Sequence, residues 1–138
     1  MLKYFFNILI ILFAVLPSLK AQSSPIVVEY NRIHAIVPPD IVSQGTNKIF
    51  KTYSVITIDF DYSLIKTYYG INRYPAESIY RIESISGLKP SKGEGEYFVF
   101  TCSASNYATV IFEVNKEMKW IKRYVPHNHI THIFYYVK

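Results

Sequence analysis

Three histidines near the end of the chain have the spacing most suggestive of chemistry. His127, His129 and His132 fall within six residues. On an extended strand His127 and His129 would share a face, because side chains alternate with a period of two, and such a pair can supply two nitrogens to zinc. A catalytic zinc needs a third protein ligand and an open position, and the spacing assigns no third ligand. The adjacent proline and asparagine favour a strand end or turn, so we predict no metal site. His127 and His129 are the only candidates for one.

Two aspartates and a glycine-rich run suggest sites but also have simpler interpretations. Asp59 and Asp61 could serve acid–base catalysis or cation binding as a carboxylate pair. Aspartates at a hairpin also accept backbone hydrogen bonds, and we interpret the pair in that way. The run over residues 92–96 is unlike a phosphate loop, because its glutamates would repel an anion and a strand follows it. We predict a turn there.

The segment over residues 119–124 interleaves basic and aromatic residues, an arrangement typical of proteins that bind single-stranded nucleic acids. The period of two also divides this segment into two faces. One face has Trp120, Lys122 and Tyr124, and the other has Lys119, Ile121, Arg123 and Val125. We interpret the segment as a half-buried strand with solvated lysines and predict no nucleic-acid partner.

Motifs that would identify an enzyme are missing. The sequence contains neither Gly-x-Ser-x-Gly nor His-Glu-x-x-His, and it has no cofactor fingerprint. It therefore favours a non-enzymatic protein without a cofactor.

The elements that position all these residues are expected to be strands. Aromatic residues make up 17% of the chain, and tyrosines alone number 13, which favours strands over helices. Eight strand-like segments cover residues 26–37, 53–60, 64–69, 78–85, 96–104, 108–114, 119–125 and 130–137. Short connections place sequence neighbours side by side in a sheet. We predict an all-β antiparallel meander that forms a closed or partly closed barrel, with a β-sandwich as the alternative.

Residues 1–21 predict export. Lys3 precedes an apolar stretch over residues 8–16, and Ala21 precedes a polar segment, as in a secretory signal peptide. The stretch is shorter than the roughly 17–25 residues that span a bilayer, so we expect cleavage and no integral membrane anchor. Residues 22–138 would then form a single β-rich domain, secreted or periplasmic. Cys102 is the only cysteine; it cannot form an intramolecular disulfide, and we predict that it is buried.

An exported eight-stranded barrel resembles the lipocalins in architecture. The resemblance implies an interior that is either filled by side chains or open for one small ligand. The Gly-x-Trp that lipocalins carry near the first strand is absent, since the sole tryptophan, Trp120, follows Lys119 late in the chain. The similarity concerns architecture and does not extend to family membership.

These observations favour a binding or interaction domain of unknown ligand. Without the leader, 13 basic and ten acidic residues leave a net charge of +3, which indicates no polyanionic partner. A filled barrel would use surface tyrosines to bind a protein or glycan; the candidates are Tyr68, Tyr69, Tyr135 and Tyr136. A hollow barrel would hold a small apolar molecule against Ile56, Ile58, Phe60, Phe98, Phe100 and Phe112.

Two alternatives belong to other functional classes. The first is a small metal-dependent hydrolase that uses His127 and His129. The second is a structural or assembly component of the cell envelope, whose strand over residues 130–137 pairs with the edge of a partner's sheet.

Overall fold

Nine strands and no helix make up the described part of the chain. The structure is a computed structural model that describes residues 23–41, 45–71 and 74–138. The strands are β1 (Ile26–Val37), β2 (Thr46–Asp59), β3 (Leu64–Ile71), β4 (Tyr74–Ile85), β5 (Lys89–Ser91), β6 (Gly95–Ser103), β7 (Thr109–Asn115), β8 (Trp120–Val125) and β9 (Ile130–Tyr135). The all-β prediction is confirmed. The predicted signal peptide over residues 1–21 lies outside the described residues.

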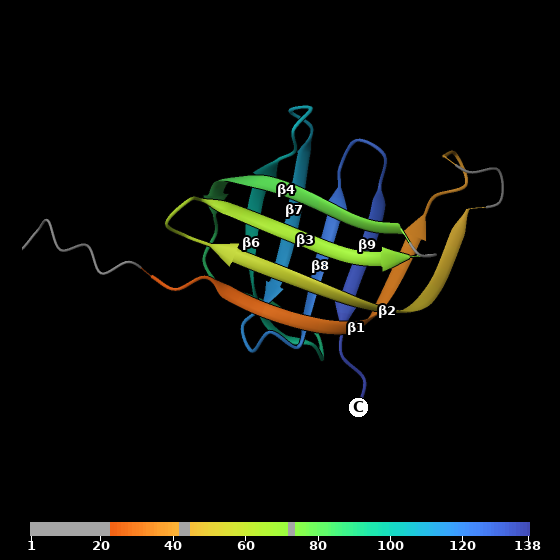
Figure 1. The fold of residues 1–138 in the computed structure, drawn as a ribbon, viewed down its shortest axis with the longest axis horizontal. Helices are drawn as coiled ribbons and strands as arrows, with labels where there is room; N and C mark the ends of the chain where they lie inside the picture. Colours follow the sequence, from red (N-terminus) through yellow and green to blue (C-terminus); the bar gives the residue numbers. More distant parts are fainter. Residues whose placement is uncertain (1–22, 42–44, 72–73) are drawn as a thin grey trace, which may run out of the picture.

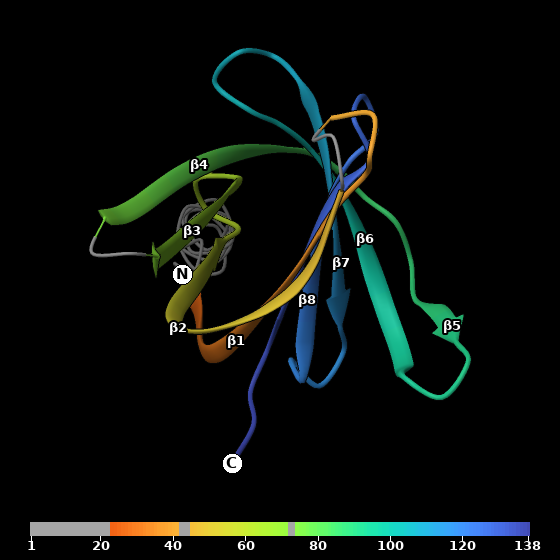
Figure 2. The same ribbon diagram turned by 90° about the vertical axis from the view of Figure 1, so that its right-hand side faces the viewer.

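Eight of the strands close into an antiparallel barrel (Figure 1). The sheet runs from β4 through β3, β2 and β1 to β9, and then through β8 and β7 to β6. It closes where Ile82 of β4 lies opposite Cys102 of β6. The short β5 pairs with the other half of β6, with Lys89 opposite Tyr97, and Figure 2 shows it outside the barrel. The predicted barrel is therefore confirmed, and the chain does not adopt the sandwich alternative.

Three departures from the predicted strands exceed two residues, while the other boundaries agree within one or two residues. Strand β2 begins at Thr46 rather than at residue 53, because backbone pairing with β1 continues to the Val37–Thr46 pair even though this stretch is largely polar. Strand β4 begins at Tyr74 rather than at residue 78. Strand β5 lies in a stretch predicted to be a loop; Pro90 is tolerated there because β5 is an outer strand that needs few backbone donors.

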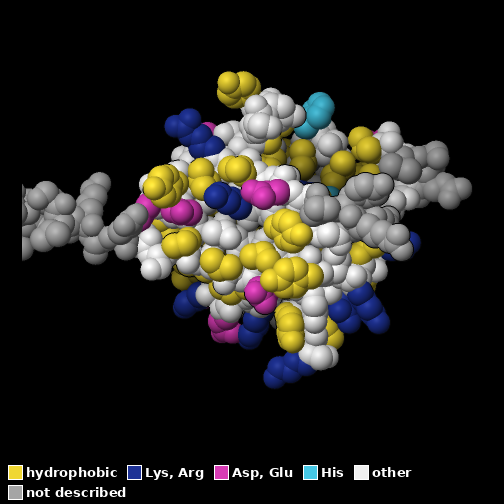
Figure 3. Space-filling view, in the orientation of Figure 1, with side chains coloured by type: hydrophobic (Ala, Val, Ile, Leu, Met, Phe, Trp, Pro, Cys, Tyr) yellow, Lys and Arg dark blue, Asp and Glu magenta, His cyan; other side chains and the backbone are white. Residues whose placement is uncertain are grey.

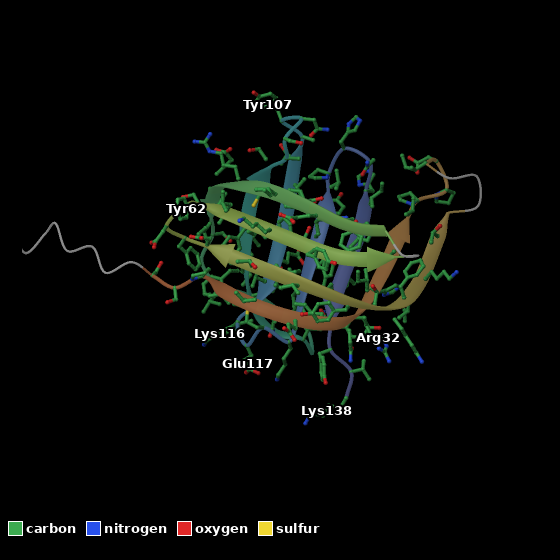
Figure 4. The ribbon with its side chains drawn as sticks, in the orientation of Figure 1. Arg32, Tyr62, Tyr107, Lys116, Glu117 and Lys138 are labelled. Carbon is green, nitrogen blue, oxygen red and sulfur yellow. The ribbon has the colours of Figure 1, made fainter. Side chains whose placement is uncertain are left out.

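Hydrophobic side chains pack together in the barrel interior. Alternate residues of each strand point inward, as the period of two requires, and Figure 4 shows their side chains between the two sides of the barrel. Tyr80 and Phe112 meet edge to face with ring centroids 5.1 Å apart, and the Tyr30 hydroxyl donates to the Met118 carbonyl at 2.8 Å. The buried core consists of Tyr30, Ile33, Ile56, Ile58, Ile65, Tyr80, Phe100, Cys102, Val110, Phe112, Val114, Ile121 and Phe134.

Candidate functional site

A hollow rich in aromatic residues lies on the outer face of β6 to β9. It has a volume of about 800 Å³, and we call it the aromatic groove. A second hollow of about 520 Å³ adjoins it, because Glu94, Lys119 and Trp120 line both. Together they form an extended concave surface centred on Trp120. The aromatic groove is lined by Ile36, Glu94, Tyr97, Glu113, Lys119, Trp120, Lys122, Thr131, Ile133, Tyr135 and Tyr136.

Strand pairing brings the rings of the groove together. Trp120 on β8 lies opposite Tyr135 on β9, and Tyr97 on β6 packs against Trp120 with ring centroids 5.9 Å apart. The Trp120 indole N–H donates to the Glu94 carbonyl at 3.2 Å, which orients the indole ring. All three rings are half-buried, so each keeps some surface for a ligand.

Asn115 joins the two turns that end the groove. Its side chain is buried, with 2% exposure. The amide nitrogen donates to the carbonyls of Glu94 at 3.1 Å and Glu96 at 3.3 Å, and the amide oxygen accepts from the backbone N–H groups of Glu117 and Lys119, both at 3.1 Å. One buried side chain thus ties the β5–β6 turn to the β7–β8 turn and positions Lys119 and Glu94 at the groove.

The charges along the groove are balanced. Lys122 pairs with Glu113 at 3.3 Å, and Lys119 pairs with Glu117 at 2.5 Å. The hydrogen bond from Lys119 lowers the pKa of Glu117. The groove therefore offers aromatic surface beside donors and acceptors, with no large excess of charge of one sign.

The four tyrosines proposed for a binding surface separate into three locations. Tyr135 and Tyr136 line the groove. Tyr68 is 40% exposed on the outer face of β3, and Tyr69 packs against Phe134 with ring centroids 6.3 Å apart. The sequence prediction therefore located part of the groove but missed Tyr97 and Trp120 as its central rings.

The residues expected around a hollow interior pack against one another instead. Phe60 lies at the β2–β3 turn, where it is 43% exposed and its ring centroid is 6.3 Å from that of Phe100. The others belong to the core or pack against it: Ile56, Ile58, Phe98, Phe100 and Phe112.

The three clustered histidines lie in different environments. His127 and His129 are exposed in the turn between β8 and β9 rather than on an extended strand. The Nδ1 atom of His129 lies 2.6 Å from the Tyr124 hydroxyl. His132 points into the barrel, where its Nδ1 atom lies 2.7 Å from the Arg123 guanidinium. Within the described residues, no three His, Cys, Asp or Glu side chains are grouped so that they could hold a metal ion.

The aspartate pair and the glycine-rich run both form turns. The Asp59 carboxylate accepts from the backbone N–H groups of Asp61 at 3.1 Å and Tyr62 at 3.2 Å, as the turn interpretation predicts. Gly93 in the turn between β5 and β6 and Gly95 at the start of β6 have φ angles of +77° and +80°, a conformation that favours glycine. This turn carries Glu94 to the groove, a role that the sequence did not indicate.

One charged side chain lies inside the barrel. Arg123 is 8% exposed and is the one buried charged residue in the described ranges. Its guanidinium donates to the Tyr80 hydroxyl at 2.7 Å and lies within hydrogen-bond distance of His132. Burial, with the nearby Arg123 charge, lowers the pKa of His132 to about 4, so that its ring is neutral at pH 7 and can accept a hydrogen bond. The alternation that places Arg123 on the face of Ile121 was the available sequence signal for this position.

Cys102 is buried, as predicted, with 1% exposure. Burial, and to a smaller extent the charge of Glu83, raises its pKa to about 12. The thiol therefore stays protonated at neutral pH, which makes it a poor nucleophile.

Comparisons with known proteins assign no family to the chain: no family model, curated protein or solved structure matches it. Among the residues that the structure describes, no helix has the length and hydrophobicity to span a membrane.

Proposed function

We propose that the protein is an exported, non-enzymatic binding domain whose aromatic groove binds a neutral oligosaccharide. The observation that carries the proposal is the set of half-buried rings of Tyr97, Trp120 and Tyr135 in one concave surface of balanced charge. Ligand sites typically combine an apolar, concave lining with a few placed polar groups, and the groove has both. Export remains an expectation from residues 1–21.

The chemistry of a sugar suits this surface. A pyranose ring presents C–H bonds on its faces and hydroxyl groups around its edge. The faces can stack on aromatic rings, whose π surface is partly negative, while the hydroxyls donate to carboxylates and accept from ammonium groups. Glu113 and Lys122 provide both kinds of group beside the rings. The adjoining hollow on the other side of Trp120 provides space for a second sugar unit.

The other candidate functions have less support. A small apolar ligand would need space that the core side chains fill. The histidines of the hydrolase hypothesis, His127 and His129, lie in an exposed turn. In the assembly hypothesis the last strand would need a free edge, but β9 pairs with β1 on one side and with β8 on the other.

Fluorescence of the single tryptophan provides the test, because Trp120 lies in the groove itself. We expect at least one neutral oligosaccharide to shift Trp120 emission in a saturable manner. The panel to be tested contains oligosaccharides of glucose, mannose, galactose or N-acetylglucosamine units. Tyr135→Ala retains the reporter and removes one ring; it should weaken binding by about tenfold, or ~1.4 kcal/mol.

Tyr107→Ala is the matched control. Tyr107 is 91% exposed and lies at the opposite end of the barrel from Lys116 and Glu117 (Figure 4). This variant should bind the sugar like the wild type. The proposal fails if no oligosaccharide in the panel changes the emission, or if Tyr135→Ala and Tyr107→Ala have equal effects.

A further inference from the structure

The barrel interior is polar toward the β8–β9 turn, on the inner side of the strands that form the groove. Arg123 and His132 face each other there across the β8–β9 pair. Ser54 and Thr67 are fully buried on β2 and β3, and Tyr80 on β4 bonds to Arg123. Toward the β7–β8 turn, by contrast, the interior is largely apolar. Arg123, Tyr80 and His132 thus contact one another inside the barrel, and two further buried hydroxyl side chains, Ser54 and Thr67, lie on β2 and β3.

The Arg123 guanidinium has no anionic partner in the described part of the chain. All described ion pairs involve lysines. The two side chains that bond to Arg123 are the hydroxyl of Tyr80 and the ring of His132, and neither carries a negative charge. A buried charge without a counter-ion is energetically costly, so this position calls for an anion.

Three buried polar side-chain atoms in the described part of the chain also lack hydrogen-bond partners. They are Arg123 Nε, Ser54 Oγ and Thr67 Oγ1. Thr67 lies opposite Ser78, which is two residues before Tyr80 on the same face of β4, so Thr67 is next to the strand whose Tyr80 bonds to Arg123. In native proteins most buried polar atoms have a hydrogen-bond partner. An unpaired N–H on an uncompensated buried charge, in an interior that holds two further unpaired hydroxyls, indicates that something outside the chain completes the set.

We propose that Arg123 anchors a second binding site, for the carboxylate of a small organic acid that enters this end of the barrel. A carboxylate supplies the missing negative charge and accepts from the Nε–H group, and its planar geometry matches the guanidinium fork. Ser54 and Thr67 can donate to its oxygens. The acid must be small because side chains fill the apolar part of the interior. This site is independent of the sugar site proposed on the outer face.

Calorimetric titration of the full chain with sodium butyrate tests the proposal, with butyramide and sodium chloride as matched controls at equal ionic strength. Butyrate should bind saturably, and the two controls should not. Arg123→Met keeps the length of the side chain and removes its charge, so the affinity for butyrate should fall at least about tenfold. The midpoint of unfolding should be unchanged or higher, because removing an uncompensated buried charge need not destabilise a protein.

Nuclear magnetic resonance on the wild-type protein keeps the test decisive if Arg123→Met does not fold. The Nε–H resonance of Arg123 should shift with butyrate and not with butyramide, and the pKa of the neighbouring His132 should rise when the anion binds. The proposal is overturned if butyrate gives no saturable heat, if chloride binds equally well as an adventitious ion only, or if the Arg123 resonance does not move. It is also overturned if folded Arg123→Met binds butyrate like the wild type.

Discussion

The outer face of β6 to β9 and the outer face of β2 to β4 both carry tyrosines, but they hold the rings differently. On the first face Tyr97 packs against Trp120, and Tyr135 lies opposite Trp120. On the second, Tyr53 is 55% exposed and Tyr68 is 40% exposed. Figure 3 shows hydrophobic side chains spread across the front of the barrel, where β2 to β4 lie in Figure 1. Similar composition thus gives a ring cluster on one face and separate rings on the other.

The difference lies in what surrounds the rings. The groove is bounded by the β5–β6 and β7–β8 turns, which Asn115 ties together. On the β2–β4 face, Tyr53 is held by its hydroxyl, which donates to Glu29 at 3.0 Å. Tyrosine content therefore does not by itself distinguish the two faces; the turns that enclose the rings of the groove do.

Phe134→Ala should give the largest effect, because it removes the wall behind the groove. Phe134 is 0% exposed and precedes Tyr135 on β9. Truncating a buried phenylalanine costs about 3–5 kcal/mol, measured as the free energy of unfolding in denaturant. Ile79→Ala on the other face, where the side chain is 50% exposed, should stay within about 0.5 kcal/mol of the wild type. Equal losses of unfolding free energy in Phe134→Ala and Ile79→Ala would contradict the distinction between the two faces.

Acid should loosen the groove side of the barrel before the other side. In the folded state the pKa of His132 is about 4, against 6.5 for the ordinary group. The unfolded chain therefore binds a proton first, and stability falls as pH drops from 6.5 to 4, by up to ~3 kcal/mol. Hydrogen exchange should show faster opening of β8 and β9 than of β2 and β3. In His132→Gln most of this acid dependence should vanish; an unchanged profile would assign it to other groups.

Asn115→Ala should have a somewhat smaller effect, focused on the groove. The substitution removes the hydrogen bonds that Asn115 makes to two carbonyls and two N–H groups. The Glu94 carbonyl keeps the Trp120 indole N–H and the Glu96 carbonyl keeps the Lys116 N–H. The cost should be about 2 kcal/mol, and oligosaccharide binding should weaken. Asn106→Ala is the matched control, because the Asn106 side chain accepts one turn hydrogen bond, from Ala108, far from the groove. Binding that survives Asn115→Ala unchanged would show that the turns do not shape the site.

The barrel could be predicted from the sequence because the patterns that mark its strands and turns are local. Alternation and turn residues identify most strands, and short connections determine their order. The start of β2 was missed because residues 46–52 are largely polar and are held in the sheet by pairing with β1. The turn at Asp59 was predicted correctly for a similar reason, since its hydrogen bonds reach only two and three residues along the chain.

The sites depend on contacts between distant segments, which local patterns do not reveal. Trp120 bonds to Glu94, 26 residues away, and Arg123 bonds to Tyr80, 43 residues away. Tyr135 and Tyr136 both line the groove, because β9 ends at Tyr135 and strand alternation does not extend to Tyr136. Only the closed barrel shows which rings Trp120 meets. Alternation predicted that Arg123 and Ile121 share one face of β8. The partners of Arg123, Tyr80 on β4 and His132 on β9, become visible only in the folded barrel.

The most direct test of the groove follows the indole N–H resonance of the protein's single tryptophan during titration with the oligosaccharide that shifts Trp120 emission. The groove account predicts that this resonance moves in a saturable manner together with those of Tyr97 and Tyr135, while Tyr53 and Tyr68 remain unchanged. Movement confined to Tyr53 and Tyr68, with a stationary indole resonance, would contradict it.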